Sequence, residues 1–132
     1  SGVLFGLALL AKSLFLAAVL SSVAGAALAA DATGVWMRAD GTSKVRISNC
    51  GGALCGSISW LKDPANAKGK VGQRVFFDMQ PDGANAWAGK AFNPEDGKTY
   101  TGKMSLSGDS LTTKGCALGG LICKSVSWRR SN

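Results

Sequence analysis

The stretch "LTTKGCALGGLICKSVSW", residues 111–128, contains two short alternating segments joined by a glycine-rich turn, with a cysteine on each side of the turn. Placing Cys116 opposite Cys123 sets Leu111 opposite Trp128. Cross-strand partners point to the same face of a sheet, and a slip by one residue moves every side chain to the other face. The stretch therefore predicts a β-hairpin with one apolar and one polar face. The other inner pair is Thr113 with Val126, and the outer pairs are Thr112 with Ser127 and Lys114 with Ser125.

The segment before this hairpin continues the separation of one apolar face from one polar face. If Leu106 lies opposite Leu111 across the turn at residues 107–110, Tyr100 and Met104 also point inward. The predicted pairing of strand 99–106 with strand 111–115 therefore places apolar side chains on the same inner face.

A third hairpin is predicted at residues 48–60, "SNCGGALCGSISW", with Cys50 opposite Cys55. This register again separates an apolar face from a largely polar one. Its inner pairs are Ile47 with Ile58 and Val45 with Trp60, and its outer pairs are Ser48 with Ser57, Arg46 with Ser59 and Lys44 with Leu61.

From residue 31 onward, short strands alternate with turn clusters, and no stretch keeps apolar residues at helical spacing for three turns. An antiparallel sheet with one apolar face and no helix to cover it buries that face by curling on itself. We expect an all-β fold, a small up-and-down antiparallel β-barrel of about eight strands. The predicted strands are 35–38, 44–49, 56–61, 74–79, 86–92, 99–106, 111–115 and 124–129. The predicted inner set is Trp36, Val45, Ile47, Ile58, Trp60, Trp87, Tyr100, Met104, Leu106, Leu111, Val126 and Trp128, with members of Val75, Phe77 and Met79.

Residues 1–30 differ in composition from the rest, because they consist mostly of Ala, Leu, Val, Phe and Gly. They end in "AALAAD", where Ala27 and Ala29 place small residues at the two positions that a signal peptidase reads. We expect a secretory signal peptide that is removed after Ala29 or Ala30, and a single barrel domain at residues 31–132 without a transmembrane anchor. The protein would then be exported, periplasmic or secreted. The alternative is an uncleaved membrane anchor, since residues 13–30 are about long enough to cross a bilayer.

The charge of the expected domain is basic but dispersed. Residues 31–132 carry 14 of the 15 Lys and Arg and all 8 Asp and Glu, a net charge of +6. Most of the basic residues stand alone between small polar residues, which is typical of a solvated outer face, whereas a nucleic-acid groove concentrates positive charge in a stripe. We expect no nucleic-acid partner. A weak attraction to anionic envelope polymers stays open.

The four cysteines predict two local disulfides, Cys50–Cys55 and Cys116–Cys123. In the registers above, each pair faces itself at the end of a hairpin, and a small exported domain is where disulfides are expected. Because the closed loops are short, each bond contributes about 2 kcal/mol. The chain has no His and only CX4C and CX6C spacings, which argues against zinc, and no helix start is predicted for a redox pair. We expect neither a metal nor a cofactor.

The titratable residues give little support for catalysis. Without histidine, the usual general base and Ser-His or Cys-His nucleophiles are missing. Most carboxylates adjoin glycine or proline, so turn formation explains them. The segment "NPEDGK", residues 93–98, has oxygen donors but too few for a dedicated calcium loop, and it predicts a hairpin turn.

Glycines share the predicted inner face with the large aromatic side chains. In a strand, glycine marks a bend, a close backbone approach or open space. Either these glycines let the tryptophans nest in a filled interior, or they leave a narrow apolar pocket. The glycines are Gly56, Gly89, Gly102 and Gly115, and the candidate lining of the pocket is Trp60, Trp87, Tyr100, Met104, Thr113 and Trp128.

The chain contains several short motifs: Gly34-X-Trp36, "VRI" (45–47), "LCG" (54–56) before "ISWL" (58–61), "NPEDGKTY" (93–100) and the closing "SWRR" (127–130). Together these motifs resemble the secreted bacterial family called domain of unknown function 2147. The resemblance covers nearly all of the expected domain, with residues 62–72 the least typical part. It implies a fold similar to the lipocalins and other calycins, in which an arginine of the last strand covers the tryptophan of Gly-X-Trp. That implies a structural role for Gly34, Trp36 and Arg129 or Arg130, with a cation–π contact of about 1 kcal/mol.

Two functions from different classes follow. The leading hypothesis is a non-enzymatic protein that binds a small hydrophobic or amphipathic ligand in the barrel, which requires a cavity of roughly a few hundred Å³. The alternative is an envelope protein–protein interaction, inhibitor or scaffold module that uses its basic outer face or its loops. An enzyme ranks third, because it needs two carboxylates that converge in a pocket.

Overall fold

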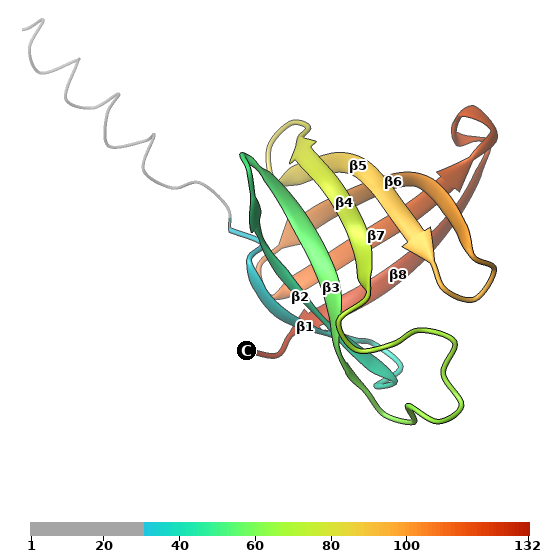
Figure 1. The fold of residues 1–132 in the computed structure, drawn as a ribbon. Helices are drawn as coiled ribbons and strands as arrows, with labels where there is room; N and C mark the ends of the chain where they lie inside the picture. The colour runs from blue at the N-terminus through green and yellow to red at the C-terminus, as the bar shows by residue number, and fades with distance from the viewer. Residues whose placement is uncertain (1–30) are drawn as a thin grey trace, which may run out of the picture.

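In the computed structural model, residues 31–132 are described, and eight antiparallel strands form a closed barrel (Figure 1). Each strand pairs with the next along the chain, and β1 pairs with β8 to close the barrel. The predicted all-β up-and-down barrel is confirmed, whereas the predicted signal peptide lies outside the described residues. The strands are β1 (Gly34–Arg38), β2 (Ser43–Cys50), β3 (Ala53–Leu61), β4 (Arg74–Pro81), β5 (Ala86–Asn93), β6 (Lys98–Ser107), β7 (Ser110–Ala117) and β8 (Ile122–Arg130).

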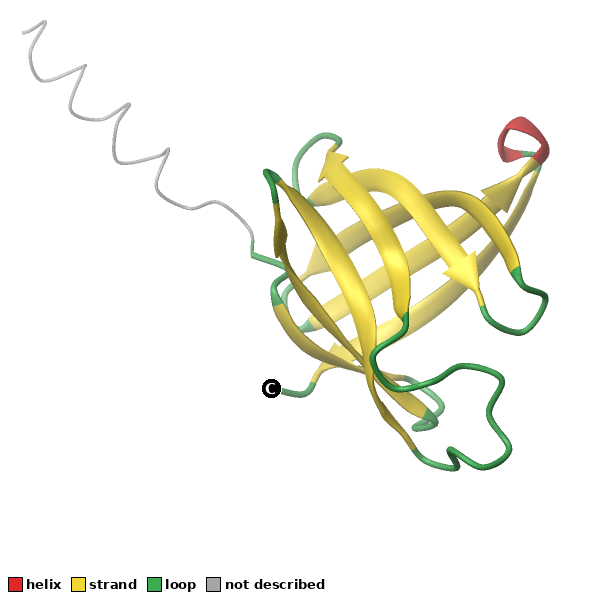
Figure 2. Cartoon of the chain, in the orientation of Figure 1, coloured by secondary structure: helices red, strands yellow, loops and turns green. Residues whose placement is uncertain are grey.

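The barrel has two different ends, because successive strands run in opposite directions and alternate connections gather together (Figure 2). We call them the open end and the closed end. The open end carries the β1–β2 turn, the β3–β4 loop, the β5–β6 turn and the β7–β8 turn, which contains the short 3-10 helix η1 (Leu118–Gly120). The closed end carries the other three turns, the start of β1 and the end of β8.

The two registers predicted for the last three strands are confirmed. In the β7–β8 pair, Cys116 lies opposite Cys123 and Leu111 lies opposite Trp128. In the β6–β7 pair, Leu106 lies opposite Leu111, and Met104 lies opposite Thr113. Met104 and Leu111 are fully buried in the core.

The register predicted for the hairpin at residues 48–60, the β2–β3 pair, is wrong by two residues. Cys50 lies opposite Ala53, not opposite Cys55, because Gly51 and Gly52 alone form the turn. Their φ angles are 64° and 86°, the conformation that a two-residue type I′ hairpin turn requires and that glycine adopts without strain. The predicted Cys50–Cys55 disulfide still forms, across a diagonal of the ladder.

A bulge in β3 corrects the prediction for Trp60. Val45 lies opposite Ile58, but Lys44 lies opposite Trp60, which leaves Ser59 as an extra residue. A bulge of one residue reverses the faces of the residues that follow it. Trp60 therefore points outward with 39% of its surface exposed, and Lys44 Nζ lies 5.6 Å from its ring centroid. The prediction that Trp60 faces the interior is wrong.

Strand β4 is also irregular, and this changes which phenylalanine is buried. Phe76 is in the core, whereas Phe77 lies beneath the Arg74 guanidinium, 5.9 Å from its ring centroid. Phe76 occupies the space beside Gly56, since a Cβ at Gly56 would lie 2.8 Å from its ring. Gly56 therefore makes room for a phenylalanine, whereas the nesting explanation expected a tryptophan beside it.

The closed end is filled by Trp36, which is completely buried. Its Nε1–H donates to the carbonyl of Ala32 at 2.9 Å, and the Arg130 guanidinium lies 4.4 Å from its ring centroid. Arg130 also donates from Nη1 and Nη2 to the carbonyls of Thr33 and Asp31, both at 2.9 Å. Of the two arginines left open by the resemblance, Arg130 covers the tryptophan.

Candidate functional site

The open end contains two adjoining cavities, which we call the first and second chambers. Their volumes are about 540 Å³ and about 340 Å³. Each is large enough to hold a small organic molecule. The chambers are neighbours because five residues line both of them: Arg38, Asn93, Pro94, Glu95 and Trp128.

The deep part of the cavity is apolar. Val45, Ile58 and Val75, all buried, line the first chamber. Trp128 separates this floor from the second chamber, and its Nε1–H donates to the buried Thr113 Oγ1 at 2.8 Å. The indole is thereby fixed in one orientation, with its polar atom satisfied inside the barrel.

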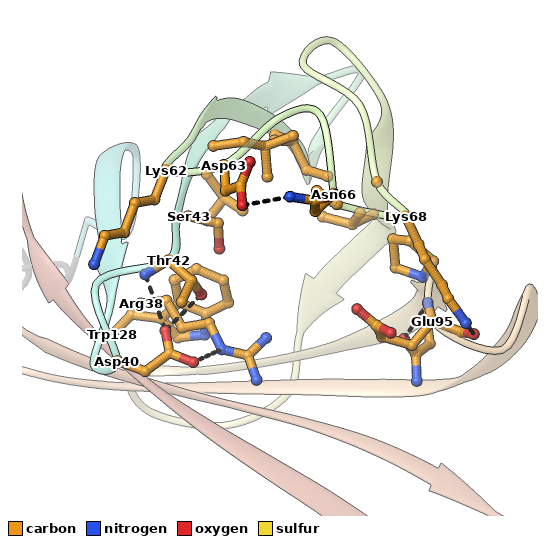
Figure 3. A pocket seen from close by; sticks show the side chains of 18 residues that line it. Arg38, Asp40, Thr42, Ser43, Lys62, Asp63, Asn66, Lys68, Glu95 and Trp128 are labelled. Atoms are coloured by element: carbon orange, nitrogen blue, oxygen red, sulfur yellow. Dashed lines mark hydrogen bonds and ion pairs between the residues drawn. The ribbon is translucent and has the colours of Figure 1, made fainter.

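The rim carries a positioned arginine. Arg38 Nε lies 3.1 Å from Asp40 Oδ2, and Thr42 donates to Asp40 Oδ1 from its backbone nitrogen at 3.1 Å and its hydroxyl at 2.6 Å. The Thr42 hydroxyl, and then its backbone N–H and Arg38, lower the pKa of Asp40, so this carboxylate is charged at neutral pH. Within residues 31–132, the two terminal nitrogens of Arg38 donate to no acceptor. Figure 3 shows this guanidinium pointing into the cavity toward the side that carries Glu95.

The β3–β4 loop forms one wall of the first chamber. Its last residues pair with β3, since Gly72 donates to the Ile58 carbonyl at 2.8 Å and Ile58 donates to the Gln73 carbonyl at 2.9 Å. Gly69 packs so closely on Ile58 that a Cβ would lie 2.8 Å from its Cδ1. Lys68 Nζ reaches the Glu95 carbonyl at 3.4 Å, so the loop also contacts the β5–β6 turn.

The β5–β6 turn forms a second wall, and the predicted hairpin turn is confirmed. Asn93 accepts from the Glu95 and Gly97 nitrogens, and Asp96 accepts from the Lys98 nitrogen. The Tyr100 hydroxyl also donates to Asp96, which lowers the pKa of Asp96 and raises the pKa of the phenol. Among residues 31–132, no group of three or more His, Cys, Asp or Glu side chains could hold a metal ion.

The predicted lining residues are only partly brought together. Tyr100, Thr113 and Trp128 line the second chamber. Met104 is buried in the core, and Trp87 lies at the closed end, where it lines a smaller hollow of about 190 Å³. Trp60, on the outer face, lines neither chamber.

Sequence reasoning missed the rim residues Arg38, Asn93, Pro94 and Glu95. Arg38 and Asn93 are the last residues of β1 and β5, and Pro94 and Glu95 lie in the β5–β6 turn, so the alternation of faces within strands does not single them out. A usable signal was present, because alternate turns of an up-and-down barrel meet at one end. The strand order alone therefore groups the β1–β2, β3–β4 and β5–β6 connections at one rim.

Both predicted disulfides are present, Cys50–Cys55 near the closed end and Cys116–Cys123 near the open end. Such bonds are typical of an oxidising compartment outside the cytoplasm. In the described part of the chain, no helix is long and apolar enough to cross a membrane.

Comparison with known proteins agrees with this architecture. The chain is similar to the solved structure of protein HP1028 from the human pathogen Helicobacter pylori, described as belonging to the lipocalin family. The TM-score is 0.64 at 19% identity, over 79% of this chain and 85% of that one, so the likeness shows a lipocalin-like fold. No curated protein matches the chain. Residues 34–130 match the family described as uncharacterised protein conserved in bacteria, DUF2147. This match spans most of the sequence, and the chain therefore belongs to the DUF2147 family.

Proposed function

We propose that this protein is a non-enzymatic, exported binding protein that holds a small amphipathic molecule in the open-end cavity. The observation that carries the proposal is an apolar floor beneath a charged rim. The apolar part of the ligand lies against Val45, Ile58 and Trp128, and its polar group lies near Arg38 at the rim.

The size and chemistry of the cavity support this proposal. Small-molecule sites usually have volumes of about 300 to 1,000 Å³ and combine an apolar lining with a few placed polar groups. The first chamber, with a volume of about 540 Å³, lies within that range. Because Asp40 holds Arg38 Nε, the guanidinium is oriented before any ligand arrives, which lowers the entropy lost on binding.

The carboxylates near the cavity support binding rather than catalysis. Asp40 is held by Arg38 and Thr42, Asp63 accepts from Asn66 Nδ2 at 2.9 Å, and Asp96 caps its own turn. Glu95 is exposed at the rim. Each of the three aspartates has a structural partner. These aspartates therefore do not form a pair of carboxylates positioned for acid–base chemistry.

The test fills the first chamber without changing the core. Ala67 lines this chamber from the β3–β4 loop, whereas Ala65 is exposed on the same loop and does not line it. We expect 1-anilinonaphthalene-8-sulfonate, an amphipathic anion, to bind residues 31–132 with enhanced fluorescence. Ala67→Phe should weaken this binding by about tenfold, because the ring occupies the space of the probe.

Ala65→Phe is the matched control and should leave the affinity unchanged. Equal effects of the two substitutions, or unaltered binding by the Ala67→Phe protein, would place the probe elsewhere and refute the proposal. Circular dichroism checks that both variants keep the barrel.

A further inference from the structure

The β7–β8 turn displays large aliphatic side chains to solvent. Leu118, Leu121 and Ile122 are 70%, 85% and 59% exposed. We call these three residues the apolar tip. Figures 1 and 2 show the hairpin extending well beyond the barrel wall, with η1 at its end. Single exposed apolar residues are common on soluble proteins, but a cluster of this kind marks an interaction site.

Neither folding nor turn formation explains the apolar tip. None of its side chains contributes to the buried core. Leu118 has a φ of 53°, a conformation that glycine or asparagine adopts more easily than leucine. The Cys116–Cys123 disulfide joins the two strands at the base of the turn and holds the leucines out in solvent. The hairpin is therefore a rigid support for an exposed apolar surface.

Lysines lie on the two strands that carry the apolar tip. Residues 110–128 contain two basic residues, Lys114 and Lys124, and no Asp or Glu. Lys114 and Lys124 are exposed on the strands that carry the tip, and Lys103 of β6 lies opposite Lys114. An apolar insertion surface flanked by lysines matches an anionic lipid surface, where each lysine near the headgroups adds to the attraction.

The apolar tip is also next to the cavity. Ile122 and Lys124 line the second chamber together with Pro94 and Glu95. A surface that binds the tip therefore meets the open end of the barrel. The closed end, with Trp36, faces away from it.

We propose that the apolar tip inserts into the interfacial region of an anionic phospholipid bilayer, with Lys114 and Lys124 at the headgroups. This contact places the open end of the barrel at the membrane surface. The proposal stands on the exposed hairpin alone and holds whether or not the cavity takes a ligand.

The test is vesicle flotation with residues 31–132, the described part of the chain, which forms the closed barrel and its buried core. Vesicles of phosphatidylethanolamine and phosphatidylglycerol are compared with vesicles of phosphatidylcholine alone. We expect binding to the anionic vesicles and a loss of at least about tenfold in the double variant Leu118→Asn/Leu121→Ser. Val71→Ser removes another exposed apolar side chain, 60% exposed on the β3–β4 loop, and should leave binding unchanged.

The electrostatic part is tested with Lys114→Gln, which should weaken binding by about fivefold. Lys70→Gln, at an exposed position of the β3–β4 loop, is the matched control. Failure of the wild-type protein to float with anionic vesicles, or equal flotation of the double variant, overturns the proposal. A wild-type dimer that becomes a monomer in the double variant also overturns it, because the tip would then bind a second copy. Chamber filling by Ala67→Phe should not affect flotation, so the two proposals can fail independently.

Discussion

The two ends of the barrel carry the same local motif, an Asp-X-Thr turn beside an arginine, and differ in what the arginine does. At the closed end, Thr33 donates to Asp31 Oδ1 from its nitrogen at 2.9 Å and its hydroxyl at 2.7 Å. At the open end, Thr42 donates to Asp40 Oδ1 in the same way. The turns are nearly equivalent, so the contrast between the ends arises from the arginines.

All three nitrogens of the Arg130 guanidinium have polar partners, whereas within residues 31–132 Arg38 has one at Nε alone. The Arg130 guanidinium stacks on Trp36, donates to two backbone carbonyls and lies 3.4 Å from Asp109 Oδ1. Arg38 is held at Nε alone, and its terminal nitrogens face the cavity. One motif therefore stabilises the fold at one end and presents a cation at the other. Substitutions at the two ends should separate these roles.

The largest expected effect is on the packing of the closed end. Trp36→Ala should lower the free energy of unfolding by about 3 to 5 kcal/mol, because it removes a completely buried indole and leaves a cavity. Trp60→Ala, at the outward-facing tryptophan, should lower the free energy of unfolding by about 1 kcal/mol or less. Urea unfolding followed by circular dichroism measures both. A loss at Trp60 as large as at Trp36 would contradict the orientation given to β3 by its bulge.

Removal of the engaged arginine should have the next largest effect. Arg130→Gln should lower the free energy of unfolding by about 2 kcal/mol, since the charged hydrogen bonds to two carbonyls and the contact with Trp36 are lost. Arg129→Gln, at the exposed neighbour, should change it by less than about 0.5 kcal/mol. The same urea titration distinguishes them, and equal losses would mean that Arg130 has no special role.

Removal of the free arginine should affect binding and not folding. Arg38→Gln should leave the free energy of unfolding within about 1 kcal/mol of the wild-type value, because the ion pair of Arg38 with Asp40 is partly exposed. It should weaken binding of 1-anilinonaphthalene-8-sulfonate by about tenfold, through loss of a charged donor for the sulfonate. A large loss of stability with unchanged affinity would reverse the roles assigned to the two ends.

The smallest effect concerns acid pH. Hydrogen bonds from Thr33 and Thr42 lower the pKa values of Asp31 and Asp40 below their ordinary value of 3.8. A lowered pKa in the folded state contributes stability above pH 3.8, and this contribution disappears as the pH falls through the lowered value.

Thr33→Val and Thr42→Val should therefore be slightly less stable than wild type at neutral pH. The difference should shrink as the pH falls below 3.8. Urea unfolding at a series of pH values checks this. A difference that stays constant with pH would show that the threonines act by packing and not through the carboxylates.

The registers of the β6–β7 and β7–β8 hairpins were predictable because the residues that determine them are close together in the sequence. Cys116 with Cys123, and the four-residue turn before Leu111, fix the register independently of the rest of the chain. The register predicted for the β2–β3 hairpin was wrong because it places the two cysteines opposite each other, whereas Cys50 lies opposite Ala53. The pair Gly51-Gly52 sets the turn and shifts the ladder by two residues.

The orientation of Trp60 and the composition of the rim were beyond local reasoning. The bulge at Ser59 depends on how β3 bends to meet both of its neighbours, which a single hairpin does not encode. The rim combines Arg38 from the end of β1, Lys68 from the β3–β4 loop and Glu95 from the β5–β6 turn, so their proximity exists only once the barrel has closed. The alternation of faces predicted the floor, but not the polar groups above it.

The pairing of β1 with β8 also determines where the C-terminus leaves the barrel, and therefore how the protein can be immobilised. Ser131 donates to the Val35 carbonyl at 2.7 Å, so the chain leaves the barrel at the closed end beside its entry (Figure 1). A tag or fusion partner joined at Asn132 would therefore extend away from the chambers. Tethering the domain to a sensor surface by its C-terminus should leave the cavity and the exposed hairpin facing the solution, where ligands and vesicles can be supplied.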